Sequence, residues 1–364
     1  MSITKVTDAG LDKSRIVTPL IINGDMSVAQ RSTSVTGVGD GDTGYHTLDR
    51  WRFSEGGDNS TVFTMSQDTN VPTGQGFAKS LKMDVTTADG SPGSSDSMFL
   101  QQRFEGQNLQ LLKKGTSIAE KITVAFWVSS SKTGTYILEL QDSDNTRNCS
   151  QSYTISSADT WEKKVVVFPA DTTGAIDNDN ANSFEVNWWL LAGTDFTSGT
   201  LATSFASRTN ANRAVGQVNV GDNTSNNFYM TGCQMEIGEF DTNTIPSFPF
   251  ESFENNLRKC QRYFYRREGE NSYGPGAQGM QIGSSNTMIQ GYHPVKMRSA
   301  PSMSVDGTWN MEVGTTAVTW NCPSTRTSTT AYSSEQSAGN SDGSAAIVYA
   351  NNDTDAAIIG DAEL

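Results

Sequence analysis

The feature that most constrains this chain is a series of short segments in which apolar and polar residues alternate. Two clear examples are "SLKMDVT" and "KITVAFWVSSS". Alternation with a period of two, broken by turn residues, is typical of antiparallel strands with one buried face. The pattern therefore predicts an antiparallel β-sandwich. The positions expected to face its core are Leu81, Met83 and Val85 in the first segment, and Ile122, Val124, Phe126 and Val128 in the second.

The composition agrees with a β protein that is rich in turns. Among 364 residues there are 33 glycines, and only 35% are hydrophobic. A chain of this length can bury one full core and leaves room for a second. The net charge of −14, with no cluster of Lys and Arg, argues against nucleic acid and anionic membrane surfaces as partners. No apolar stretch is long enough for insertion into a membrane.

Changes in composition and in the alternation pattern along the chain predict four parts. The start, "MSITKVTDAG", reads as a docking arm and contains no export signal, so we expect the protein to be made in a cytosol. Two long polar stretches, around 86–97 and 193–227, are expected to be loops. The four parts are an N-terminal attachment arm (1–15), the sandwich (16–245), a connecting segment with a helix (246–267) and a small C-terminal β domain (268–364).

One segment, "FESFENNLRKCQRYFYRR", predicts a helix that connects the two β regions. Ser252 stands where an N-cap is expected, and Arg266 and Arg267 stand at the expected C-terminal end. The apolar residues recur every three or four positions, so they share one face, which we expect to pack against the sandwich. These helix-packing residues are Phe253, Leu257, Cys260 and Phe264.

No catalytic constellation is evident, and the sequence predicts a protein that is not an enzyme. The two histidines, His46 and His293, have no acidic or cysteine neighbours, and no nucleophile, zinc or phosphate-loop motif occurs. A glycosidase would need two carboxylates at catalytic distance, and no particular pair is indicated. Four scattered cysteines are expected to be reduced: Cys149, Cys233, Cys260 and Cys322.

The tryptophans suggest a binding surface. In "NSFEVNWWLL" the alternation assigns Trp188 to the core and Trp189 to the opposite face, and Trp127 shares its face with the small residues Thr123, Ala125 and Ser129. An indole ring next to amides and carboxylates suits a sugar. The alternative is that both rings lie in a subunit interface or under a loop. Trp51 and Trp161 are expected to anchor the core. The candidate carbohydrate-binding residues are Trp127, Trp189, Glu139, Gln141, Glu185 and Asn187.

Several motifs resemble known families. "LIINGDMSVAQRST", "YHTLDRWRF" and "MTGCQMEIGEFDT", together with the helix and the final "DAEL", resemble tail-fibre and receptor-binding proteins of tailed bacteriophages. "ITVAFWVSSSKTGTYILELQD" and "SADTWEKKVVVF" are similar to jelly-roll carbohydrate-binding modules. Many such modules hold a structural calcium near the first strand. Here Met26 stands in place of the expected acid, so no cofactor is predicted. Asp25 and Glu236 could still serve as oxygen ligands, which leaves a structural calcium as an open alternative.

The resemblance implies an all-β fold: an antiparallel jelly-roll sandwich, one connecting helix and a smaller C-terminal β domain. It also implies a structural virion protein that acts as a homotrimer, located in the tail fibre. Its implied partners are other virion tail proteins and host-surface polysaccharide, with host attachment as the role. Two alternatives stay open: a capsid or tail decoration protein without a receptor, and a stand-alone carbohydrate-binding module.

Overall fold

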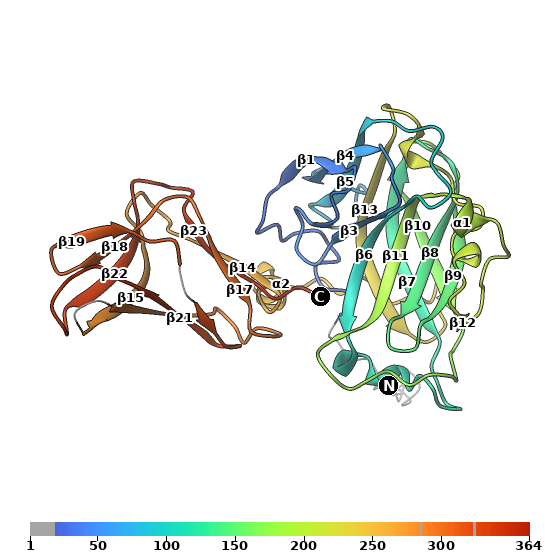
Figure 1. The fold of residues 1–364 in the computed structure, drawn as a ribbon. Helices are drawn as coiled ribbons and strands as arrows, with labels where there is room; N and C mark the ends of the chain where they lie inside the picture. Colours follow the sequence, from blue (N-terminus) through green and yellow to red (C-terminus); the bar gives the residue numbers. More distant parts are fainter. Residues whose placement is uncertain (1–18, 284–285, 323–324) are drawn as a thin grey trace, which may run out of the picture.

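The computed structural model describes residues 19–283, 286–322 and 325–364, and the predicted arm at 1–15 lies outside them. The fold is all-β, with a large sandwich and a smaller C-terminal β domain joined through helix α2 (Figure 1). Every strand pairing in the described residues is antiparallel. None of the helices there is long and apolar enough to cross a membrane.

The first lobe is a jelly-roll sandwich of two facing sheets. The six-stranded sheet contains, in spatial order, β1 (Ser34–Gly39), β4 (Val62–Asp68), β5 (Ser80–Thr87), β13 (Asn227–Ile237), β7 (Ile122–Ser130) and β10 (Glu162–Phe168). The seven-stranded sheet contains β12 (Ala206–Ser207), β9 (Arg147–Ile155), β8 (Gly134–Asp142), β11 (Asn182–Ala192), β6 (Ser97–Glu105), β3 (Arg52–Gly56) and β2 (Gly44–Tyr45).

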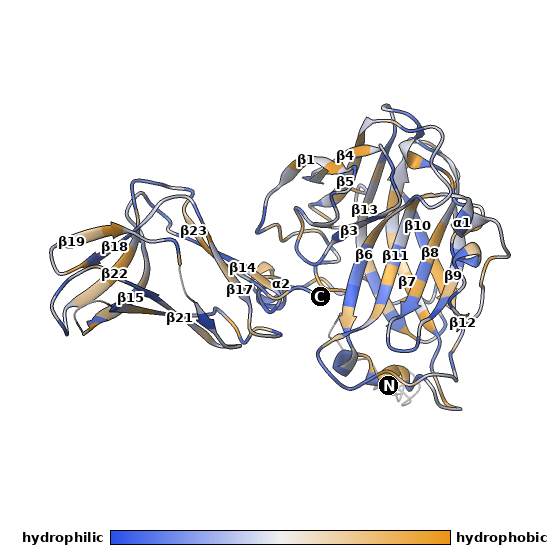
Figure 2. Ribbon diagram, viewed as in Figure 1, coloured by the Kyte–Doolittle hydropathy of each residue, from blue (hydrophilic) through white to orange (hydrophobic). Residues whose placement is uncertain are grey.

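Alternating residues of the two sheets fill the core between them, as the sequence predicts. All seven positions named above in "SLKMDVT" and "KITVAFWVSSS" are buried there. Figure 2 shows hydrophobic and hydrophilic residues in turn along part of β11. Trp51 anchors this core as predicted, with its ring 5.3 Å from that of Trp188. One position differs: a bulge between Trp189 and Leu191 turns Leu191 into the core, although strict alternation predicts the opposite face.

The C-terminal lobe also has two sheets. The smaller one contains β14 (Phe264–Glu268), β23 (Ala357–Asp361) and β17 (Ser302–Asp306). The larger one contains β19 (Thr316–Thr319), β18 (Trp309–Val313), β22 (Ala345–Ala350), β15 (Pro275–Ile282), β16 (Asn286–Tyr292), β21 (Ala331–Gln336) and β20 (Arg326–Thr327). Trp309 and Trp320 meet edge to face at 6.4 Å in the core of this lobe.

Helix α2 (Phe253–Gln261) begins where the sequence predicts, but it buries only part of the predicted face. Ser252 caps it, because its hydroxyl accepts a bond from the Asn255 amide at 3.4 Å. Phe253 is 54% exposed, so the prediction that it packs inward is wrong. The buried positions of the helix are Asn256 and Cys260, while Leu257 is half-buried.

The helix also ends earlier than the sequence suggests. The chain enters β14 at Phe264, which is buried there as a strand residue. Arg266 and Arg267 therefore belong to a strand and do not cap the helix.

The remaining helical segments lie in the loops of the sandwich. The prediction of a single helix missed one α-helical turn, because the surrounding stretch, 193–227, reads as a polar loop. These segments are α1 (Thr194–Thr197) and 3-10 turns at Gly106–Asn108, Gln110–Leu112, Asn210–Asn212 and Val220–Asp222.

Candidate functional site

The six predicted carbohydrate-binding residues do not share one surface. Trp127 lies in β7, on the outer face of the six-stranded sheet. The other five lie in β8 and β11, on the outer face of the seven-stranded sheet. The prediction of an indole beside these carboxylates and amides is therefore wrong for Trp127, because the sandwich core separates the two outer faces.

Trp189 is buried beneath the loop that follows β11. Its ring packs at 5.0 Å from Phe99 and at 5.5 Å from Phe196 of α1, and the residue has no exposed surface. Residues 193–214, which read as a polar loop, thus form a small second core over this sheet. The sequence allowed Trp189 to be a sugar-binding ring or a ring in an interface or under a loop. In the structure the ring lies under a loop.

The polar residues beneath that loop form a closed network around Glu139. Arg213 donates to Glu139 Oε1 at 2.8 Å and to Oε2 at 2.9 Å. The Nε1 of Trp189 donates to Glu139 Oε2 at 3.1 Å. Burial opposes the charge of Arg213, but the Glu139 carboxylate raises the pKa of the guanidinium above its usual value. A buried carboxylate with this many partners holds the loop on the sheet and is not open to a sugar.

The other members of the predicted set are equally enclosed. Gln101 donates to Glu185 at 2.7 Å and to Asn187 at 2.9 Å. Asn187 in turn donates to Glu139 at 3.2 Å, and Arg213 donates to Gln141 at 3.3 Å. The predicted polar residues are therefore hydrogen-bonded to other side chains of the protein.

The outer face of the six-stranded sheet carries a half-exposed aromatic cluster. Strand register places Tyr229 of β13 opposite Ser129 of β7, and Trp161 directly precedes β10 on the other side of β7. Because Ser129 is small, the Trp161 and Tyr229 rings meet above it, edge to face at 6.1 Å. Trp127 stands in the next row, between Lys163 and Thr231. We call Trp127, Trp161 and Tyr229 the aromatic surface.

Polar groups fix and flank this aromatic surface. Trp161 Nε1 donates to Asn70 Oδ1 at 3.2 Å, which orients the indole ring. The ammonium of Lys82 lies 5.6 Å from the centre of the Tyr229 ring and 3.2 Å from Asp84. Aromatic rings beside hydrogen-bonding groups provide both halves of what a sugar needs: an apolar plane for C–H bonds and partners for hydroxyls.

Trp161 and Tyr229 are the residues that sequence reasoning missed. Trp161 was expected to anchor the core, yet it is half-buried and lies outside the core cluster. Phe168 and Val166 face the core, so positions 164 and 162 point the same way. The odd-numbered positions, and with them Trp161, lie on the outer face. The alternation within "WEKKVVVF" is therefore enough to predict that Trp161 faces outward.

Asp25, one of the two oxygen donors named for calcium, is engaged in the structure, and the cysteines are buried. In the described residues no three His, Cys, Asp or Glu side chains are grouped to hold a metal ion. Asp25 accepts a bond from Ser27 at 3.0 Å and another from Asn256 at 3.0 Å. All four cysteines are free, as predicted, and all are buried. Burial raises the pKa of the Cys149 thiol to about 12.

Comparison with known proteins finds no matching family model and no matching curated sequence. Solved structures do share similarity in fold. One is the enzymatically active domain of bacteriophage CBA120 tailspike protein 4, at 15% identity and a TM-score of 0.28, covering 52% of this chain but only 19% of the tailspike.

Two others are carbohydrate-binding modules. A family 11 module from Clostridium thermocellum, solved with a mixed-linked β-1,3-1,4 tetrasaccharide, has 8% identity and a TM-score of 0.29, covering 57% of this chain and 96% of the module. A xylan-binding family 22 domain has 11% identity and a TM-score of 0.27, covering 53% and 89%. Likeness at this level leaves the function to be argued from the residues of this chain.

Proposed function

We propose that this chain binds glycans through the aromatic surface formed by Trp127, Trp161 and Tyr229. The observation that carries the proposal is the edge-to-face pair of Trp161 and Tyr229, half-exposed on a rigid sheet above Ser129. A ring held by its neighbours loses little conformational freedom when a sugar stacks on it, so more of the contact energy becomes affinity. Lys82, Asp84 and Asn70 stand close by as partners for hydroxyl groups.

We further propose that this binding serves host attachment by a tailed bacteriophage, as part of a tail fibre in the virion. The motifs "LIINGDMSVAQRST" and "DRWRF" and the segment around α2 support this through their resemblance to receptor-binding proteins. In that role the chain works as a homotrimer, docked on other tail proteins and directed at host-surface polysaccharide. Three copies of a weak site on one particle gain avidity without any new contact.

Two other roles predict different behaviour. A decoration protein without a receptor would bury the aromatic surface between subunits and bind no polysaccharide. A stand-alone carbohydrate-binding module would bind polysaccharide as a monomer. Light scattering on the purified chain separates these roles when it is combined with the binding test below, because it reports the mass in solution.

The binding test replaces Trp161 with Ala and measures retention on host polysaccharide by affinity electrophoresis. We expect Trp161→Ala to weaken binding about tenfold or more, the equivalent of about 1.4 kcal/mol. The matched control is Tyr273→Ala, which removes an aromatic ring of the C-terminal lobe that is 62% exposed. Equal retention of Trp161→Ala and the parent protein would contradict the role of the aromatic surface.

A further inference from the structure

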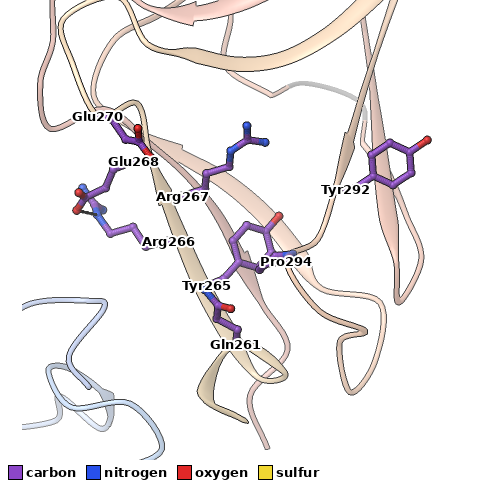
Figure 3. Close-up of a pocket in the computed structure, with 8 residues that line it drawn as sticks. All are labelled: Gln261, Tyr265, Arg266, Arg267, Glu268, Glu270, Tyr292 and Pro294. Carbon is purple, nitrogen blue, oxygen red and sulfur yellow. Dashed lines mark ion pairs between the residues drawn. The ribbon is translucent and has the colours of Figure 1, made fainter. Parts of the chain in front are cut away.

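The C-terminal lobe contains a hollow of about 420 Å³ on the side where β14 follows α2. Figure 3 shows residues of β14 on one side of it and Tyr292 on the other. A hollow of this size lies within the range of about 300–1,000 Å³ that small-molecule sites occupy. The residues that line it are Gln261, Tyr265, Arg266, Arg267, Glu268, Glu270, Tyr292 and Pro294.

The floor of the hollow is preorganised by a chain of hydrogen bonds. The hydroxyl of Tyr265 lies 3.0 Å from Nδ1 of His293, and Nε2 of His293 lies 3.1 Å from the carbonyl of Ser328. Burial lowers the pKa of His293, so the ring is neutral at pH 7. One tautomer satisfies both contacts: Nε2 donates to the carbonyl, and Nδ1 accepts from the Tyr265 hydroxyl. The floor is therefore fixed before any ligand arrives.

The two neighbouring arginines of β14 differ in the ion pairs and hydrogen bonds that they make. Arg266 pairs with Asp306, donates to the carbonyl of Asp355 at 2.8 Å and lies 3.7 Å from Glu268. Arg267 is exposed and makes no ion pair within the part of the chain that the structure describes. The chain has a net charge of −14, yet this guanidinium pairs with none of its described carboxylates. A guanidinium without an ion pair in a hollow can bind an anionic group of a ligand.

Tyr292 lies across the hollow from β14. Tyr292 ends β16 and is 75% exposed, a high value for a ring of this size, and Pro294 follows it in the lining of the hollow. An open tyrosine ring offers a plane on which the C–H face of a sugar can stack, together with a hydroxyl at its edge.

We infer that this hollow binds a sugar residue that bears a carboxylate, such as a hexuronate unit of an acidic polysaccharide. Its carboxylate pairs with Arg267, its ring lies against Tyr292, and its hydroxyls donate to Glu268 and Glu270. One guanidinium without an ion pair matches the single charge of a carboxylate better than the double charge of a phosphate monoester, and the two glutamates accept hydrogen bonds from ring hydroxyls. The inference goes beyond the proposed function, since it uses a different lobe and no residue of the aromatic surface.

The test uses the full chain and isothermal titration calorimetry with two probes, a galacturonate tetrasaccharide and the neutral galactose tetrasaccharide. We expect the parent protein to bind the galacturonate about tenfold or more tightly than the neutral probe. Arg267→Gln should abolish that preference, and Tyr292→Ala should weaken binding of both probes. Arg326→Gln is the matched control, because Arg326 is an exposed arginine of the same lobe that pairs with Glu335 at 2.9 Å.

Three results would overturn the inference: no galacturonate binding, equal binding of both probes, or an unchanged preference in Arg267→Gln. Failure of this site is distinguishable from failure of the proposed function. Trp161→Ala should leave galacturonate binding unchanged, and Arg267→Gln should leave binding of neutral polysaccharide by the aromatic surface unchanged.

Discussion

Lys114 sits in a cage of oxygen atoms at one end of the sandwich. Its ammonium contacts Asp142, lies 2.9 Å from Asp171, and donates to the carbonyls of Thr173 at 3.0 Å and Gly174 at 2.7 Å. The Lys114 and Asp142 side chains are almost fully buried. Two carboxylates and two carbonyls around one positive charge resemble the surroundings of a bound cation, and here a side chain supplies that charge.

Replacing Lys114 by Met should destabilise the protein strongly. The substitution leaves the buried Asp142 carboxylate without its cation, and breaking a buried pair in this way costs about 3–5 kcal/mol. The measurement is the free energy of unfolding in urea. Lys113→Met is the control, because Lys113 and its partner Glu120 are both exposed, and an exposed pair contributes at most about 1 kcal/mol. Similar losses in the two variants would refute the cage as a stabilising unit.

Asp49 gives stability a dependence on pH. Burial raises the pKa of its carboxyl to about 7, and although Arg31 and Gln30 lower the pKa, they do not offset the burial. The unfolded chain has a pKa of about 3.9 there, so the folded state holds an extra proton between roughly pH 4 and pH 7. The contribution of Asp49 is therefore fully present below pH 4 and is lost as the pH rises through 7.

We expect Asp49→Asn to flatten this dependence. The difference in unfolding free energy between the parent and Asp49→Asn should shift in favour of the variant as the pH rises from 5 to 8. Urea denaturation at several pH values provides the measurement, and taking the difference removes the contributions of other titrating groups. A constant difference across that range would show that Asp49 does not titrate there.

At the scale of elements, α2 is held by the amide of Asn256 together with Cys260, the one fully buried member of its apolar stripe. Asn256 Oδ1 accepts from the Asn23 amide at 3.1 Å. Its Nδ2 donates to Asp25 at 3.0 Å and to Ser27 at 2.9 Å. The helix thus binds the first described loop of the sandwich by ordered hydrogen bonds.

Asn256→Ala should loosen this junction. The substitution leaves the buried Asn23 amide without a partner, which costs about 1–3 kcal/mol. Hydrogen exchange should show faster exchange of amides 23–28 together with a lower unfolding free energy. Asn255→Ala, one position away and exposed, is the control and should change neither quantity appreciably. Unchanged protection at 23–28 in Asn256→Ala would contradict the role of this amide.

These elements also mark what the sequence could predict. Period-two patterns are local, so the fold class, the strands and the core positions of β5 and β7 follow from them. Trp189 and Trp127 show the same local pattern, yet only Trp189 is covered, because residues 193–214 fold back over β8 and β11. That choice depends on contacts between distant segments such as Arg213 and Glu139, which no local window contains. The bulge at Leu191 is a second case, since it needs the register of β6.

At the scale of the whole molecule, the last residues return to the sandwich and join the two lobes. Glu363 pairs with Arg50, a fully buried guanidinium that also donates to the carbonyl of Arg103 at 2.6 Å. Burial opposes this charge, but Glu363 raises the pKa of Arg50. Arg50 thus binds the end of the C-terminal lobe to the sandwich.

Removing the charge of Glu363 should weaken the attachment of the two lobes. Glu363→Gln leaves Arg50 buried without its counterion, at a cost of about 3–5 kcal/mol. We expect faster proteolysis in the connecting segment 246–262 and a lower unfolding free energy. Glu270→Gln, an exposed carboxylate of the same lobe, should cleave at the parental rate. Parental rates for Glu363→Gln as well would mean that other contacts join the lobes.

The position of β23 has a consequence for how this protein is made. This strand lies between β14 and β17, and pairs with both. A ribosome releases β14 some ninety residues before the strand that completes its sheet, whereas all the strands of the sandwich are available earlier. The sandwich can therefore fold during synthesis, while the edge of β14 that pairs with β23 remains without a partner strand. Any product cut short before residue 357 would keep that edge exposed, so such fragments should be the species that aggregate or are degraded.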